Sequence, residues 1–307
     1  MVLAHALVTL AVVWILGASP GPAPAEWAAG VENWRRTREA ELTKEDGWLS
    51  VAGLFFLHEG DNRVGADPDA DVVLPIGSAP AVAGRLIHEA AATRFEPAPG
   101  VAATLDGRPV AGPVTLAFAD PAARRPASRL VVGRVSLQLH RSGNRPGIRL
   151  RDPESPYRRS FTGLRWFGID PAWRLRGRFV PYATPREIPI QNVLGDLEPM
   201  RSPGEIELVL EGERVRLVAL QAARDRLWLV FSDGTAGTLT YRTRFLYLDA
   251  PGADGGVIVD FNRAYNPPCA FNPHTTCPLP PRQNRLAAAV MAGELRHSDH
   301  VRTSNDE

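Results

Sequence analysis

The chain has 307 residues, 44% of them hydrophobic, which is enough for one large or two modest domains with a sizeable core. Its 35 basic and 34 acidic residues leave a net charge of +1, which argues against nucleic acid or another polyanion as a partner. The 27 glycines and 28 prolines favour many short elements joined by tight turns, and so a mainly β protein.

Residues 1–25 have the pattern of a secretory signal peptide. An apolar run over residues 6–16 leads into a stretch of small residues and prolines that ends at Ala25. That run is too short to span a bilayer, which needs ~20 apolar residues. A retained anchor or a misassigned start codon is the alternative. We expect an exported protein, periplasmic or extracellular, without stable membrane insertion after cleavage.

Residues 26–47 are predicted to form an N-terminal helix. Trp27, Val31 and Trp34 recur at helical spacing on one face, and Gly47 supplies a stop signal. Short apolar runs bounded by Gly, Pro, Asp and Asn then predict a β unit over residues 48–148.

Part of this β unit is comparable to the hairpins of forkhead-associated domains. Ala66 and Gly84 stand where those domains carry a phosphate-facing Arg and a Ser. Phosphothreonine recognition needs such donors. We therefore expect a hairpin of similar shape without that binding site, in which His88 serves as a turn hydrogen bonder.

A second β unit is predicted over residues 149–295. Glu211-Gly212 between two alternating runs indicates a hairpin, and Asp225-Arg226 and Asp233-Gly234 indicate the next turns of a meander. An alanine-rich stretch, residues 284–295, is expected to form a short closing helix, and residues 296–307 a disordered tail. The core side of the meander should hold Leu208, Leu210, Leu217, Leu227, Leu229 and Phe231.

Three segments carry a resemblance to a known family. They are GWLSVAGLFFLHEGDNRVGADPDADVVLP from residue 47, RLRDPESPYRRSFTGLRWF from residue 149, and DFNRAYNPPCAF…TCPLPP…NRL from residue 260. Together they resemble the signatures of an uncharacterised prokaryotic family, domain of unknown function 1684. The resemblance covers most of the chain and implies no established activity.

The chain's two cysteines lie in a proline-rich segment, residues 262–285, which we call the cap loop. In an exported protein, Cys269 and Cys277 are expected to form a disulfide that makes the loop rigid. A zinc or copper site formed by Cys269, His274 and Cys277 is a weaker alternative, because no fourth ligand is evident. A nucleophilic cysteine with His274 as its base is another.

Polar residues near the cap loop suggest a ligand site in a cleft between the two β units. Arginine beside amide side chains can grip a carboxylate or sugar hydroxyls, although such groups also pair with one another to fasten a loop. The candidate binding residues are Arg151, Asp152, Trp166, Arg244, Asp260, Asn262, Asn266 and Arg285.

The sequence therefore predicts a mainly β protein with two antiparallel, sandwich-like units, an N-terminal helix and a short C-terminal helix. The leading function is the binding of a small polar or saccharide ligand under the cap loop. An extracytoplasmic hydrolase is the alternative, and Asp152, Glu154, Asp249 and Asp260 are its first candidate carboxylates. A structural or adaptor protein is the third. No cofactor is predicted, since nucleotide-binding and metalloprotease motifs are absent from the sequence.

Overall fold

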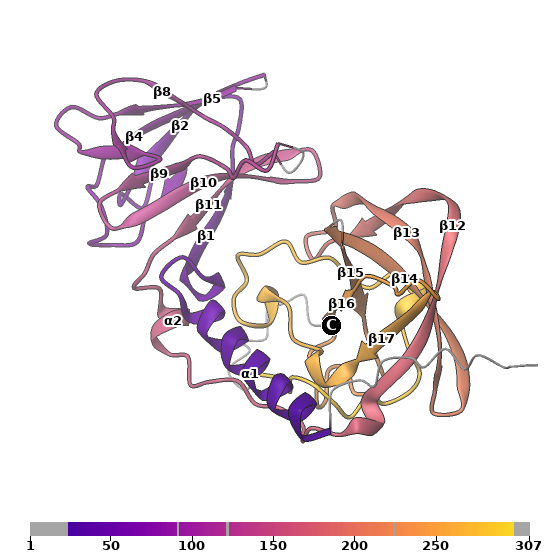
Figure 1. The fold of residues 1–307 in the computed structure, drawn as a ribbon. Coiled ribbons are helices and arrows are strands. Elements are labelled where there is room, and N and C mark those ends of the chain that lie inside the picture. Colours follow the sequence, from indigo (N-terminus) through magenta and orange to yellow (C-terminus); the bar gives the residue numbers. More distant parts are fainter. Residues whose placement is uncertain (1–23, 91, 121–122, 224, 298–307) are drawn as a thin grey trace, which may run out of the picture.

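The structure is a computed structural model that describes residues 24–297 except 91, 121–122 and 224 (Figure 1). The predicted signal peptide and the predicted disordered tail fall almost entirely outside this range. Two β lobes are visible, with one long helix running along the C-terminal lobe toward the junction between them (Figure 1). The predicted fold class is confirmed: the chain is mainly β, with several antiparallel sheets and an N-terminal helix.

The N-terminal lobe packs two sheets around one hydrophobic core. One sheet has the strand order β1-β11-β10-β9-β6-β7 and the other β3-β2-β4-β5-β8. Neighbouring strands are antiparallel, apart from the short parallel pair of β2 and β3. The strands are β1 (Val51–Phe56), β2 (Gly60–Gly65), β3 (Val72–Val73), β4 (Gly84–Glu89), β5 (Ala92–Pro97), β6 (Ala103–Leu105), β7 (Arg108–Pro109), β8 (Val114–Leu116), β9 (Arg129–Val132), β10 (Val135–Ser142) and β11 (Arg145–Arg151).

Strand β10 shows how the sequence sets the two faces of this sheet. Leu137 and Leu139 are buried in the core, whereas Gln138 and His140 point to the opposite face, as strand alternation requires. Strand β11 pairs with β10 through Arg151 and contributes Ile148 to the same core. The boundary predicted at residue 149 therefore falls inside β11, and the chain leaves this lobe only after Arg151.

The C-terminal lobe is one curled, antiparallel sheet with the order β16-β15-β14-β13-β12-β17. Its edge strands β16 and β17 lie next to one another, so the sheet curls around its own core. Beyond β17, Tyr265 pairs with Phe245 of β16 through two backbone hydrogen bonds of 2.8 and 2.9 Å. The strands are β12 (Arg174–Gln191), β13 (Leu197–Leu210), β14 (Glu213–Ala223), β15 (Arg226–Phe231), β16 (Arg244–Asp249) and β17 (Gly256–Asp260).

The predicted meander in this lobe is confirmed. Leu210 pairs with Glu213 across a two-residue turn in which Glu211 and Gly212 have φ of 50° and 86°. Positive φ at both positions suits the right-handed twist of the two strands. The six residues predicted for the core side all belong to the core of this lobe.

Helix α1 (Pro24–Thr43) is fastened to the C-terminal lobe by buried apolar residues and by arginines. Trp27 and Val31 of the helix are buried. Arg35 donates hydrogen bonds to the carbonyls of Phe167 and Asn262, and Arg38 donates to the carbonyl of Asn266 at 2.9 Å. Of the described helices, α1 is not apolar enough to cross a membrane and the others are too short to do so.

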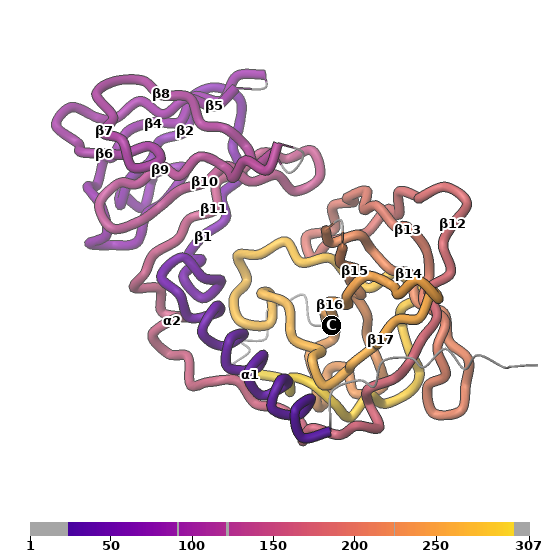
Figure 2. The backbone as a smooth tube through the Cα atoms, viewed as in Figure 1, coloured from indigo at the N-terminus to yellow at the C-terminus, as the bar shows by residue number. Residues whose placement is uncertain are grey.

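The remaining helical elements are single turns. They are α2 (Pro156–Arg159) and the 3₁₀ turns η1 (Trp48–Ser50), η2 (Pro171–Trp173), η3 (Phe261–Arg263), η4 (Pro268–Ala270) and η5 (Arg282–Asn284). Figure 2 shows that part of the chain after β17 lies between α1 and the C-terminal sheet, whereas η5 packs against β14 and β15.

The prediction of a closing helix over residues 284–295 was wrong. Only η5 is helical there, and the alanine-rich chain beyond it forms neither a helix nor a strand. Its backbone is held by the sheet instead: Gly234 donates to the carbonyl of Ala288, and Arg244 donates to the carbonyls of Val290 and Ala292. Tertiary hydrogen bonds therefore override the helix propensity of alanine.

Candidate functional site

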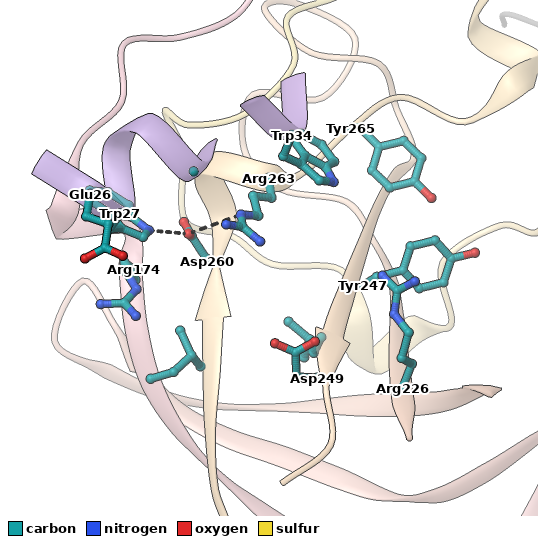
Figure 3. Close-up of a pocket in the computed structure, with 13 residues that line it drawn as sticks. Glu26, Trp27, Trp34, Arg174, Arg226, Tyr247, Asp249, Asp260, Arg263 and Tyr265 are labelled. Carbon is teal, nitrogen blue, oxygen red and sulfur yellow. Dashed lines mark hydrogen bonds and ion pairs between the residues drawn. The ribbon is translucent and has the colours of Figure 1, made fainter. Parts of the chain in front are cut away.

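A cavity of about 390 Å³ lies between α1 and the adjacent edge strands of the C-terminal sheet (Figure 3). Its side chains come from α1, from β12, β15, β16 and β17, and from the chain that follows β17. They are Glu26, Trp27, Gly30, Trp34, Arg174, Arg226, Tyr247, Leu248, Asp249, Ile258, Asp260, Arg263 and Tyr265.

Helical spacing places the residues of α1 over this cavity. Trp27, Gly30 and Trp34 are three and four positions apart and therefore share one face of the helix. Gly30 also lines the cavity, and a Cβ atom there would meet Nη2 of Arg263 at 3.7 Å, an ordinary contact distance. A longer side chain at this position would extend toward the cavity.

Aromatic rings line one side of the cavity. The rings of Trp34 and Tyr247 each lie near that of Tyr265, with centroids 6.1 and 6.2 Å apart. Burial, reinforced by the nearby Tyr247, raises the pKa of Tyr265, so this phenol stays neutral at physiological pH. Tyr247 is 38% exposed, and the guanidinium of Arg226 lies 4.7 Å from the centre of its ring.

Asp260 is a fixed anchor at the end of β17. Its Oδ2 accepts a hydrogen bond of 2.8 Å from the indole nitrogen of Trp27, and Arg263 approaches the same oxygen at 3.9 Å (Figure 3). Its Oδ1 accepts from the backbone and side-chain nitrogens of Asn262. Both oxygens are therefore used to hold α1 and η3 in place.

The cavity also contains charged groups that are open to solvent. Asp249 and Arg226 are exposed at the ends of their strands, and Glu26 is exposed on the first turn of α1. Arg174 is half-buried and lies 5.7 Å from the ring centre of Trp27. A ligand in the cavity would thus meet aromatic faces together with charged groups of both signs.

Of the eight predicted binding residues, Asp260 alone lines this cavity. Arg244 and Asn262 are completely buried and serve the fold. Arg244 forms an ion pair of 2.8 Å with buried Asp233 and donates to two backbone carbonyls. Asn262 bridges Asp260 and the backbone of Asp170.

The next two predicted residues lie outside the lining of the cavity. The side chain of Asn266 is buried and donates to Glu294 and to the carbonyl of Leu295. Trp166 packs edge-on against Trp34 and carries the guanidinium of Arg35 over its ring. Both therefore connect α1 to the C-terminal segment.

The last three predicted residues are farther away. Arg151 and Asp152 belong to the N-terminal lobe, where Asp152 forms a salt bridge of 2.9 Å with Arg134. Arg285 is exposed and donates to the carbonyl of Pro280. The eight predicted residues thus lie in different parts of both lobes, and only Asp260 lines the cavity.

The four candidate carboxylates for a hydrolase are also distributed over the two lobes. Asp249 and Asp260 share the cavity. Asp152 and Glu154 instead surround Arg134 in the N-terminal lobe, within 2.9 and 3.4 Å.

Cys269 and Cys277 are both buried free thiols that hydrogen bond to one another. Burial raises the pKa of Cys269. Burial also opposes ionisation of Cys277, but hydrogen bonds from the Cys269 thiol, Thr275 and the Cys269 amide lower its pKa below the usual value. The disulfide stays a prediction for this adjacent pair.

The alternative metal site gains no support from the geometry. Across the described chain, no group of three His, Cys, Asp or Glu side chains is arranged to hold a metal ion. His274 instead packs edge-on against Tyr157, with ring centroids 6.0 Å apart.

The sequence patterns placed some of the cavity residues on a helix face and on a strand, but they did not predict that these residues meet. Trp27 and Trp34 were expected on the packed face of the first helix, and Tyr247 lies on the alternating strand Arg244–Asp249. Their convergence depends on the curl of the sheet, which brings β16 beside β17. Local sequence patterns do not encode that closure.

Residues 159–295 match the model of a family described as "Protein of unknown function (DUF1684)". No curated protein matches the chain. Among solved structures, the chain is similar to the solution NMR structure of an uncharacterized protein from gene locus rrnAC0354 of Haloarcula marismortui. The two are 33% identical, over 48% of this chain and 85% of that one, with a TM-score of 0.41.

Proposed function

The chain belongs to the family of proteins of unknown function DUF1684, and we propose that it binds a small polar ligand, most simply a saccharide, in the cavity beneath α1. The observation that carries the proposal is the pairing of aromatic faces with solvent-open charged groups in one concave site. Trp34, Tyr247 and Tyr265 supply the aromatic faces, and Arg226 and Asp249 supply the charges.

The chemistry of such a lining suits a sugar ring. Aromatic rings offer flat apolar surface to the C–H face of a sugar, and carboxylates and guanidinium groups accept from and donate to its hydroxyls. Small-molecule sites are typically concave, with a few convergent polar groups among apolar ones. A volume of about 390 Å³ lies within the range of such sites.

Binding is favoured over hydrolysis by the state of Asp260. Two carboxylates of the cavity could in principle act as an acid and base pair. Asp260, however, already accepts hydrogen bonds at both oxygens from Trp27 and Asn262. Asp249 and Glu26 remain as carboxylates open to a ligand, which suits recognition of hydroxyl groups.

We further propose that this binding occurs outside the cytoplasm. The support is the signal-like pattern of residues 1–25. A reporter fused behind residue 30 tests this directly: export of the reporter supports the proposal, and retention in the cytoplasm contradicts it.

Thermal unfolding with a panel of neutral, amino and uronic hexoses and their disaccharides tests ligand binding. A ligand at 100 times its Kd should stabilise the folded state by about 2.7 kcal/mol and raise Tm in a saturable way. Replacing Tyr247 by Ala should weaken binding by roughly tenfold, because it removes an exposed aromatic face. A panel without any saturable shift would count against the proposal.

Two matched controls separate the cavity from general effects. The guanidinium of Arg186 lies over Tyr182 at 4.0 Å, the same kind of pair as Arg226 over Tyr247 but outside the cavity. The Tyr182→Ala variant should therefore bind normally. Gly30→Leu should block the cavity, whereas Gly30→Ala should not, since both substitutions suit a helix and only the former is long enough to enter.

A further inference from the structure

A second group of polar side chains lies at the junction of the two lobes, on the outer face of β10 and β11. Gln138 and His140 of β10 point to the same side as Arg149 and Arg151 of β11, because Arg149 pairs with Gln138 in the register. Arg149 and Arg151 are two positions apart on one strand, so their Cα atoms are about 6.7 Å from one another. We call these four residues the junction cluster.

The junction cluster is partly covered by elements from both sides. The ring of Trp48 in η1 lies 5.1 Å from the guanidinium of Arg149 and 5.8 Å from that of Arg151. From the cap loop, Thr276 lies 3.0 Å from Nε2 of His140. The loop is itself fixed beside Trp48, since the side chain of Asn272 donates to the Trp48 carbonyl at 2.9 Å. Arg149 and Arg151 are thus half-buried between Trp48 of η1 and the cap loop.

His140 adds no charge to this cluster at neutral pH. Burial, together with the charges of Arg149 and Arg151, lowers its pKa to about 4. Its Nε2 therefore accepts a hydrogen bond from Nη2 of Arg149 at 3.1 Å, since a guanidinium can only donate.

The positive charge of the cluster is not balanced within the described chain. Neither Arg149 nor Arg151 forms an ion pair with any described carboxylate, and the Nε of each is buried without a hydrogen-bond partner. Their protein partners are neutral: His140 and Thr276 for Arg149, and the Gln138 amide oxygen for Arg151 at 2.6 Å. Asp46, Glu198 and the Cys277 thiol influence these guanidinium groups only from a distance.

We propose that the junction cluster is a binding site for a small oxyanion, a carboxylate or a phosphate group. A guanidinium presents parallel N–H donors that match two oxygens of such a group, and two guanidiniums on one strand can grip it together. Gln138 and Thr276 can supply further donors. The anion would provide the charge that the described chain does not, and it would touch both lobes through β11 and the cap loop.

Calorimetric titration with inorganic phosphate and, separately, with acetate tests this site. Ionic strength is held constant with sodium chloride, because salt alone relieves repulsion between like charges. The wild-type protein should bind at least one of the two in a saturable manner. Arg151→Gln and Arg149→Gln should each weaken that binding by about tenfold or more, the effect of losing one charge-assisted hydrogen bond.

Two further variants keep the test decisive. Arg141→Gln removes the same charge from an exposed position of β10, where Arg141 packs over Phe118, and should leave binding unchanged. Arg151→Lys retains the charge and the fold but lacks the planar fork, so its affinity should fall as well. Absence of saturable binding in the wild-type protein, or an equal loss in Arg141→Gln, would overturn the proposal.

Discussion

Two groups of buried or half-buried arginines serve opposite purposes in this molecule. Arg244 in the C-terminal lobe is fully enclosed and neutralised by Asp233 at 2.8 Å, and its two Nη atoms also donate to the backbone carbonyls of Val290 and Ala292. Arg149 and Arg151 at the lobe junction have only neutral protein partners. Burial of an arginine therefore does not mark a binding site by itself. The absence of a described carboxylate partner is what distinguishes the junction.

The largest expected effect comes from removing the paired arginine. Arg244→Met leaves Asp233 as an uncompensated buried charge and should lower the free energy of unfolding by roughly 3–5 kcal/mol. Urea unfolding measures the change. Arg285→Met, at an exposed position, is the control and should alter stability little. A loss below about 1 kcal/mol in Arg244→Met would show that the pair contributes little.

Oxidation of the two cysteines tests the same comparison, because ionisation of the Cys277 thiol would place a negative charge that acts on Arg149 from a distance. A disulfide between Cys269 and Cys277 would close a short loop and should add up to about 2.5 kcal/mol to the free energy of unfolding. Intact mass and urea unfolding with and without reductant report both changes. Two thiols that still react fully after exposure to oxidant would contradict the predicted disulfide.

Glu294, which lies close enough to Arg244 to interact with its charge, should make the stability of the C-terminal lobe depend on pH. Burial raises the pKa of Glu294 to about 7 from 4.5, despite nearby Arg38 and hydrogen bonds from Asn266. The folded state therefore retains a proton that the unfolded state releases. The stability due to this group is fully present below pH 4.5 and is lost as pH rises to about 7, by at most about 1.4 kcal/mol per pH unit.

Glu294→Gln should remove this slope while keeping a neutral side chain beside Asn266. Urea unfolding between pH 4.5 and 7 measures the difference from the wild-type protein. His140 acts in the opposite sense, because its lowered pKa makes stability fall as pH drops from 6.5 to about 4. His140→Gln therefore serves as the counterpart, and equal pH profiles for both variants would contradict the assignment.

The smallest effect is expected at the junction cluster. Arg149→Met removes neutral hydrogen bonds but also relieves repulsion from Arg151, so the free energy of unfolding should change by less than about 1 kcal/mol in phosphate-free buffer. Urea unfolding under these conditions provides the test. A loss as large as that of Arg244→Met would mean that the two regions do not differ.

Much of the fold follows from local patterns in the sequence. The Glu211-Gly212 turn and the six core residues of the meander were predictable, because they depend on neighbours along the chain. The alanine-rich segment was not, since its backbone is held by Arg244 and Gly234 from distant strands.

The sites were harder to predict for the same reason. The sequence grouped Arg151 with Arg244 by residue type and nearness to the cap loop, yet the two lie in different lobes. The cavity arises where a helix from the start of the chain crosses two edge strands from its end. This arrangement depends on the curl of the sheet and on how α1 packs against it. No single stretch of the sequence specifies either of them.

The proposed binding function is tested most directly by the indole N–H signals of the protein in an NMR titration with the sugar panel. Trp27 and Trp34 line the cavity, whereas Trp48 lies at the lobe junction, and substitution by Phe assigns each signal. We predict that a bound sugar shifts the Trp27 and Trp34 signals in a saturable way and leaves Trp48 unchanged. A panel that moves neither cavity signal, or that moves Trp48 instead, would contradict the account.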